Sequence, residues 1–199
     1  MLHVIERRTG AVILAAGASS RMRRNKMLLD VHGVPMVRHA VQVAIDAGVS
    51  PIVVVVGNDE AQVREALSGL DCHFAVNPDF TGPTSTSLHA GLRALDESVD
   101  ATVVLLADMV RVTAAMVRAL IASVKESSAP LAVSRYGDVL APPLLFRRSL
   151  WPELLAWHGE GCGKAVVKAH QHQAIMHDWP MVALRDVDTP EDYRDVVTS

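Results

Sequence analysis

The chain has 199 residues, of which 50% are hydrophobic and 21% charged, and its formal net charge is −3. This length and apolar content predict one globular domain over 1–199 and exclude a disordered chain. The slightly negative charge excludes a dedicated nucleic-acid binder, and no apolar run is long enough to span a membrane. The two cysteines fit a reduced compartment better than a disulfide framework, so we expect a cytoplasmic protein.

Strand-like and helix-like runs alternate along the chain, a pattern typical of βαβ units around a mainly parallel sheet. Pro142 and Pro143 predict that the strand containing them is an edge strand or an irregular segment. In chain order, the expected elements are a strand at 11–14, a helix at 35–47, a strand at 52–56, a helix at 60–67, a strand at 72–76, a helix at 86–95, a strand at 101–106, a helix at 114–124 capped by Thr113, strands at 129–133 and 140–146, helices at 150–157 and 163–170, a strand at 181–184 and a terminal helix from Pro190.

Small residues follow the first expected strand, beginning with Ala15, Ala16 and Gly17. Small side chains allow backbone N–H groups to approach phosphate oxygens, and Arg21 and Lys26 then supply positive charge. The glycine spacing of a P-loop or of a dinucleotide fold is absent from this segment. The stretch could also be read as an export leader, but its apolar run is short for one and arginines follow it immediately. We therefore predict a nucleoside triphosphate site here.

Asp108 stands just past the carboxyl end of the strand expected at 101–106, where open parallel sheets bind their ligands. A carboxylate there can hold Mg²⁺, which requires one or two protein oxygens and takes its other ligands from water and phosphate. Asp188 is the expected second ligand, although its position before Thr189 and Pro190 also suits a helix cap. The residue types thus predict Mg²⁺ as cofactor.

The stretch 14–26 resembles the L-A-A-G-x-S-x-R-M-G-x-x-K signature of the MobA-like nucleotidyltransferase family, specifically its molybdenum cofactor cytidylyltransferase branch. Arg23 departs from it, because the family usually has glycine there. Asp108 in L-A-D-M and Asp188 in D-V-D-T-P-E-D resemble the two metal aspartates of the family. The matching positions of the first motif are Leu14, Ala15, Ala16, Gly17, Ser19, Arg21, Met22 and Lys26.

This resemblance implies a three-layer α/β/α Rossmann-like sandwich of the nucleotide-diphospho-sugar transferase type. It implies catalytic roles for Arg21, Lys26 and Asp108, and metal binding by Asp108 and Asp188. The segment 77–92 resembles the family region that lines the base and ribose. The implied nucleotide-binding residues are Leu14, Ala15, Ala16, Gly17, Ser19, Arg21, Lys26, Asn77, Gly82 and Ser87.

The half of the chain that faces the second substrate in the family departs from the family pattern. The histidine of G-H-P is missing before Pro142, and G-D-x-G-A-R is replaced by a segment with Glu160 and Lys164 in place of aspartate and arginine. We expect Lys164 to bind the acceptor phosphate, but more weakly than the arginine of the family, since lysine cannot form bidentate hydrogen bonds.

The implied reaction is nucleotidyl transfer from a nucleoside triphosphate to a phosphorylated acceptor, with release of pyrophosphate. Ala15-Ala16-Gly17, where guanylyl-transferring relatives tend to have A-G-G, favours CTP over GTP, and molybdopterin is the implied acceptor. A sugar phosphate or another small phosphate remains open as acceptor. A non-catalytic nucleotide-binding maturation protein also remains open, and a molybdoenzyme or its maturation factor is the implied protein partner.

Overall fold

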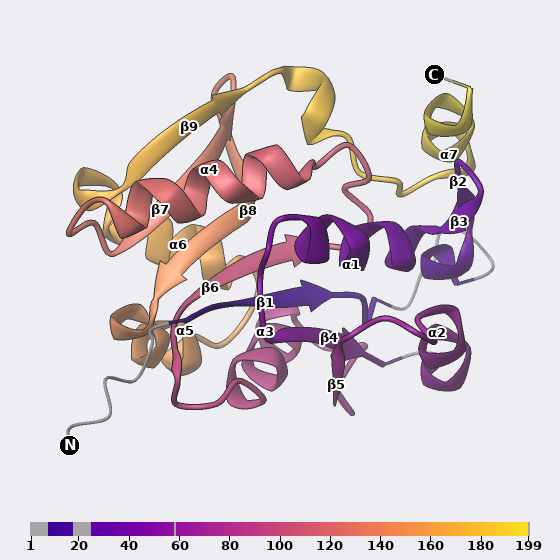
Figure 1. Cartoon of the computed structure of the whole chain (residues 1–199), viewed down its shortest axis with the longest axis horizontal. Helices are drawn as coiled ribbons and strands as arrows, with labels where there is room; N and C mark the ends of the chain where they lie inside the picture. Colours follow the sequence, from indigo (N-terminus) through magenta and orange to yellow (C-terminus); the bar gives the residue numbers. More distant parts are fainter. Residues whose placement is uncertain (1–7, 18–24, 58, 199) are drawn as a thin grey trace.

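The computed structural model describes residues 8–17, 25–57 and 59–198. Its main elements alternate along the chain as strands and helices (Figure 1). They are β1 (Arg8–Leu14), β2 (Asp30–Val31), β3 (Val34–Pro35), α1 (Met36–Asp46), β4 (Ile52–Val56), α2 (Glu60–Ala66), β5 (His73–Val76), α3 (Thr84–Arg93), β6 (Val99–Leu106), α4 (Ala114–Lys125), β7 (Leu131–Tyr136), β8 (Val139–Arg147), α5 (Trp151–Ala156), α6 (Cys162–Ala169), β9 (Ile175–Trp179) and α7 (Pro190–Val197).

Seven of the described strands form one sheet in the order β5-β4-β1-β6-β8-β7-β9. All neighbouring pairs are parallel except the two made by β8, which runs antiparallel to β6 and β7. The carboxyl ends of β1, β4 and β6 therefore lie side by side at one edge of the sheet, and the predicted nucleotide loop and Asp108 follow β1 and β6. The predicted mainly parallel α/β sandwich is confirmed.

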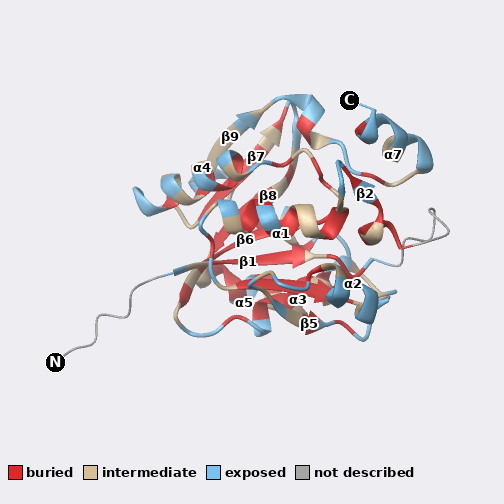
Figure 2. Ribbon diagram, turned by 45° about the vertical axis from the view of Figure 1, so that its right-hand side comes forward, coloured by how far each residue is buried: buried red, intermediate tan, exposed pale blue. Residues whose placement is uncertain are grey.

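Helices cover both faces of this sheet because its strands are apolar on both sides. Along β1, Ala11 and Ile13 join the core under α1 and α4, whereas Val12 joins the core under α3, α5 and α6. Figure 2 shows the buried strands between these two helical layers. Continuous apolar strands are typical of a sheet buried on both faces. Among the described residues, no helix is long and apolar enough to cross a bilayer.

Two expectations about the second half of the sheet require correction. The strand with Pro142 and Pro143 is not at the edge: β8 lies between β6 and β7, and its pairing with β7 shifts register at these prolines. The irregularity was predicted correctly, and it leaves the prolines where no ladder N–H is needed. The last strand is Ile175–Trp179, whereas 181–184, expected as a strand, forms a 3₁₀ turn.

Candidate active site

Asp108 and Asp188 lie together at the carboxyl edge of the sheet, although they are distant in the sequence. β1 and β6 pair through Leu14 and Leu106, and the N–H of Ala107 donates to the Leu14 carbonyl at 3.1 Å. This places Asp108 directly beside the start of the nucleotide loop. The N–H of Val187 then donates to the Asp108 carbonyl at 3.2 Å, which draws the segment before α7 onto the same edge.

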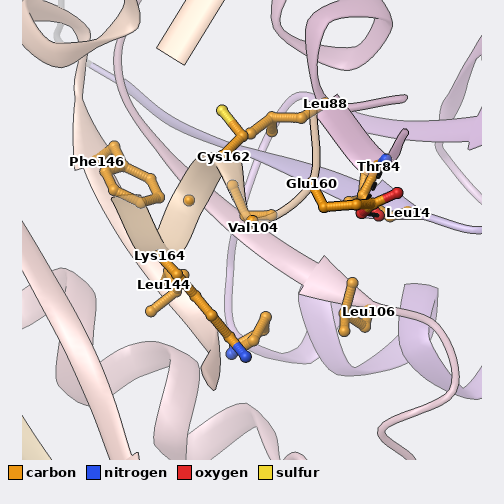
Figure 3. Close-up of a pocket in the computed structure, with 13 residues that line it drawn as sticks. Leu14, Thr84, Leu88, Val104, Leu106, Leu144, Phe146, Glu160, Cys162 and Lys164 are labelled. Atoms are coloured by element: carbon orange, nitrogen blue, oxygen red, sulfur yellow. Dashed lines mark hydrogen bonds between the residues drawn. The ribbon is translucent and has the colours of Figure 1, made fainter. Parts of the chain in front are cut away.

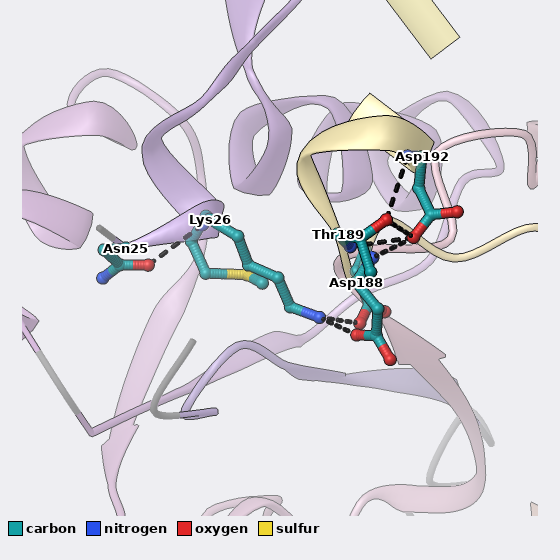
Figure 4. A network of polar contacts seen from close by, with 7 residues as sticks. Asn25, Lys26, Asp188, Thr189 and Asp192 are labelled. Carbon is teal, nitrogen blue, oxygen red and sulfur yellow. Dashed lines mark hydrogen bonds and ion pairs between the residues drawn. The ribbon is translucent and has the colours of Figure 1, made fainter. Parts of the chain in front are cut away.

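Lys26 joins the two carboxylates (Figure 4). Its Nζ lies 2.7 Å from Oδ2 of Asp108 and 2.7 Å from Oδ1 of Asp188. The Lys26 side chain is 11% exposed and that of Asp108 is 17% exposed, so solvent screens this contact weakly, whereas the Asp188 side chain is 37% exposed and its contact is screened more. Burial lowers the pKa of Lys26, but the Asp108 and Asp188 carboxylates outweigh burial and raise its pKa above the usual 10.5. The ammonium is therefore charged at neutral pH.

The carboxylate pair fits a magnesium ion. Oδ1 of Asp108 is buried and has no hydrogen-bond partner among the described residues, so its lone pairs are available to coordinate a metal ion. Partial burial, followed by the charges of Asp188 and Asp108, raises the pKa of nearby Asp186. Within the described ranges no group of three or more His, Cys, Asp or Glu side chains could hold a metal. A two-carboxylate site suits Mg²⁺, which keeps several waters and binds substrate phosphates.

Asp188 does not cap the terminal helix, the alternative role that its position suggested. The N-cap of α7 is Thr189, whose hydroxyl accepts from the N–H of Asp192 at 3.2 Å. The Asp192 carboxylate accepts in return from the backbone N–H of Thr189 at 2.8 Å and from that of Asp188 at 3.2 Å. This capping box fixes the backbone beside Asp188 while its own carboxylate faces Lys26.

The start of the predicted nucleotide loop lies over the ends of β4 and β6. Ala15 and Ala16 are buried, and the N–H of Ala15 donates to the carbonyl of Val55 at 3.0 Å. A Cβ on Gly17 would meet no atom of the described residues within 4 Å. Ser19, Arg21 and Arg23 lie outside the described residues, and the roles expected for Ser19 and Arg21 stay predictions.

Gly57, which sequence reasoning missed, shapes the floor beside this loop. A Cβ there would lie 2.3 Å from Cβ of Phe80 and 3.0 Å from the carbonyl oxygen of Ala16. Gly57 thus lets the segment around Phe80 approach the nucleotide loop closely. The signal available in the sequence was a glycine directly after the valine strand β4.

The residues expected to line the base and ribose make a connected turn in front of α3. The Asn77 side-chain amide donates to the hydroxyls of Thr86 and Ser87, each at 2.9 Å, and Asn77 is 3% exposed. A Cβ on Gly82 would lie 2.4 Å from a carboxylate oxygen of Asp79. Ser87 belongs to the first turns of α3, which begins at Thr84 and so starts before the expected position. Asn77 and Gly82 build the turn, and a nucleotide contact by these residues and Ser87 stays a prediction.

A cavity of about 430 Å³ opens beside this edge of the sheet (Figure 3). Its charged lining residues are Lys164, the expected acceptor residue, and Glu160. The Glu160 carboxylate accepts from the Thr84 hydroxyl at 2.8 Å and from the Thr84 N–H at 3.4 Å, and it thereby covers the N-terminus of α3. Sequence reasoning did not foresee this contact. The apolar side chains of the lining are Leu14, Leu88, Val104, Leu106, Pro142, Leu144 and Phe146.

Cys162 also lines this cavity but is not built as a nucleophile. Its side chain is buried and donates to the carbonyl of Leu154 at 3.3 Å. Burial raises the pKa of the thiol to about 11, so the thiolate is scarce at neutral pH.

Known proteins are similar to this chain in sequence and in architecture. The purine catabolism protein PucB of Bacillus subtilis is 27% identical over 194 residues, which cover 92% of each chain. The bifunctional protein GlmU of Cupriavidus necator is 41% identical over 113 residues, which cover 56% of this chain and 24% of GlmU. The chain thus spans about a quarter or less of the length of the GlmU relatives it matches.

Among solved structures, Rv0371c of Mycobacterium tuberculosis H37Rv superimposes with a TM-score of 0.85 at 26% identity, covering 98% of this chain and 100% of that one. A manganese complex of the same protein superimposes with a TM-score of 0.77 at 27% identity, covering 97% and 99%. A family model also matches residues 11–174, which is most of the sheet and both helical layers. The chain belongs to the family of the MobA-like NTP transferase domain.

Proposed function

We propose that the chain is a magnesium-dependent nucleotidyltransferase that moves CMP from CTP onto molybdopterin, in the cytoplasm. The observation that carries this proposal is the cluster of Lys26, Asp108 and Asp188 at the carboxyl edge of the parallel sheet, directly beside the nucleotide loop. Family membership supports nucleotidyl transfer and a nucleoside triphosphate as substrate. The existence of a manganese complex of Rv0371c supports a divalent metal as cofactor.

In this reaction an acceptor phosphate oxygen attacks the α-phosphorus of the nucleotide, the bond to the β-phosphate oxygen breaks, and pyrophosphate leaves with the electron pair. The attacking group is already anionic, so the protein needs no nucleophile and no strong general base. Lys26 and Arg21 are assigned to neutralise the triphosphate, and Asp108 and Asp188 would hold Mg²⁺. When bound, Mg²⁺ supplies a Lewis acid that neutralises charge developing on the phosphate oxygens.

The choice of nucleotide depends on the first turn of the loop. Ala15-Ala16-Gly17 occupy the positions at which guanylyl-transferring relatives tend to have A-G-G, and both alanines are buried. The alanine at position 16, in place of the glycine of the guanylyl-transferring relatives, is the sequence difference that supports a pyrimidine nucleotide. CTP is therefore the proposed donor.

The cavity that Leu14, Leu106 and Lys164 help to line supports an acceptor with a ring system. Its walls are mainly aliphatic and aromatic, and Lys164 at its rim can meet a phosphate. A pterin ring can bury its faces against such walls, whereas the hydroxyl groups of a sugar phosphate would find few partners there. This favours molybdopterin over a sugar phosphate, with the product passed to a molybdoenzyme or its maturation factor.

The test is pyrophosphate release with each of the four ribonucleoside triphosphates, Mg²⁺ and either molybdopterin or a sugar 1-phosphate as acceptor. We expect turnover with CTP and molybdopterin, and a product that carries CMP by mass spectrometry. Turnover with a sugar 1-phosphate instead would replace the proposed acceptor. Binding of CTP and molybdopterin without turnover for any acceptor would support the non-catalytic maturation protein.

A further inference from the structure

The ammonium of Lys26 occupies the place between the two carboxylates where a divalent ion is expected. It contacts Oδ2 of Asp108 and Oδ1 of Asp188 at equal distances of 2.7 Å. Two carboxylates without a cation between them would repel each other in this partly buried position. Lys26 is therefore their counter-ion in the protein without ligands.

The backbone of Lys26 is fixed, so its side chain alone can change partner. Lys26 begins a 3₁₀ turn, Lys26–Leu28, whose N-cap Asn25 accepts from the N–H of Met27 at 2.9 Å. Asn25 and Met27 are both buried. The flexible four-carbon stem of a lysine can still carry its ammonium several ångströms from this anchor.

A divalent ion and this ammonium compete for the same oxygens. Mg²⁺ binds carboxylate oxygens at about 2.0–2.1 Å, so an ammonium hydrogen-bonded to the same atoms would lie close to it and repel it. If a metal ion displaced Lys26 in the absence of nucleotide, the partly buried ammonium would lose its contacts with the two carboxylates. This cost opposes metal binding. A triphosphate offers the ammonium new anionic partners and removes this opposition.

We propose that Lys26 keeps divalent metal off Asp108 and Asp188 until a nucleoside triphosphate draws its ammonium away, so that metal and nucleotide enter the site together. This inference rests on the proposed function, because it takes the triphosphate as the ligand that releases Lys26. If the nucleotide raises the affinity for the metal by removing Lys26, thermodynamic linkage requires the bound metal to raise the affinity for the nucleotide by the same factor.

The decisive measurement is Mn²⁺ binding to nucleotide-free protein, followed by the electron paramagnetic resonance signal of the free ion. We expect Lys26→Met to bind Mn²⁺ at least about tenfold more tightly than the wild type, within the range usual for coupled sites. Lys26→Gln, which keeps a hydrogen-bond donor without the charge, should show the same gain and serves if Lys26→Met folds poorly. Lys164→Met removes a lysine that lines the neighbouring cavity and should leave Mn²⁺ binding unchanged.

Two further results separate this inference from the proposed function. Adding Asp108→Asn to Lys26→Met should abolish the gain, which locates the ion on the carboxylate pair. Both Lys26 variants binding Mn²⁺ no more tightly than the wild type would overturn the counter-ion role. In a separate arm, the wild type is titrated with the α,β-methylene analogues of CTP and of the other three ribonucleoside triphosphates in the presence of Mg²⁺. Failure of all four analogues to bind would overturn the proposed function, whereas a gain of Mn²⁺ affinity in Lys26→Met would still support the role of Lys26.

Discussion

Replacing Asp108 by asparagine should remove activity while leaving the fold nearly as stable as before. The change keeps the shape of the side chain and removes one negative charge from the edge of the sheet. Activity depends on this charge as a metal ligand, and we expect kcat to fall by roughly 10²–10³-fold, the usual order for losing one electrostatic contact to a transition state.

The stability estimate follows from the contacts of the two carboxylate oxygens. Oδ2 of Asp108 loses its ion pair with Lys26, worth roughly 1.5–3 kcal/mol as a hydrogen bond to a charged group. Oδ1 is buried without a partner among the described residues, and asparagine leaves an uncharged polar atom there, which costs less to bury than a carboxylate oxygen. Lys26 keeps its pair with Asp188, whose repulsion by Asp108 also disappears. The net change in the free energy of unfolding should stay within about 1–2 kcal/mol.

Urea unfolding and pyrophosphate release on the same preparations test this reasoning. Asp178→Asn is the matched control. Asp178 lies on the edge strand β9, away from β1 and β6, and its carboxylate pairs with Arg135 of β7. The control should retain full activity. A loss of more than about 3 kcal/mol in Asp108→Asn would show that the ion cluster is chiefly structural. An unchanged rate would remove Asp108 from the mechanism.

Three further predictions concern packing, capping and thiol chemistry. Gly91→Ala should destabilise the protein by about 1 kcal/mol in urea unfolding. The new Cβ would lie 2.4 Å from Cγ1 of buried Val12, and this overpacking outweighs the gain in helix propensity. A more stable variant would contradict this. Hydrogen bonds from Thr189 lower the pKa of Asp192 below 3.8. Asp192→Ala should therefore lower the free energy of unfolding by about 0.5–1 kcal/mol at pH 7, and this difference should fade as the pH drops below 3.8. A pH-independent difference would refute the capping account. Cys162, with its pKa raised to about 11, should react with Ellman's reagent at pH 8 far more slowly in native protein than in urea, and equal rates would contradict its burial.

Local sequence pattern predicted most elements of the fold. The valine run predicted β4 with the bounds that it has, and Thr113 caps α4 as its position before an amphipathic helix indicated. The same patterns failed at β9, where His177 and Asp178 interrupt the apolar residues of a half-exposed edge strand. The apolar stretch after it was expected as a strand, but Met181 and Val182 are exposed in a 3₁₀ turn. A hydrophobic pattern indicates which residues are buried. An edge strand is held by backbone pairing and needs fewer buried apolar side chains, so its pattern is weaker.

The residue types of the site were readable from the sequence, but their contacts were not. Asp108 was predicted from its place after a buried strand, and a loop with small residues and a lysine predicted a phosphate site. Tertiary structure alone decided that Lys26 bridges Asp108 and Asp188, and that Glu160 covers the start of α3. The physical reason is that strand and helix signals are local, whereas contacts between charges depend on which strand ends the sheet order brings together.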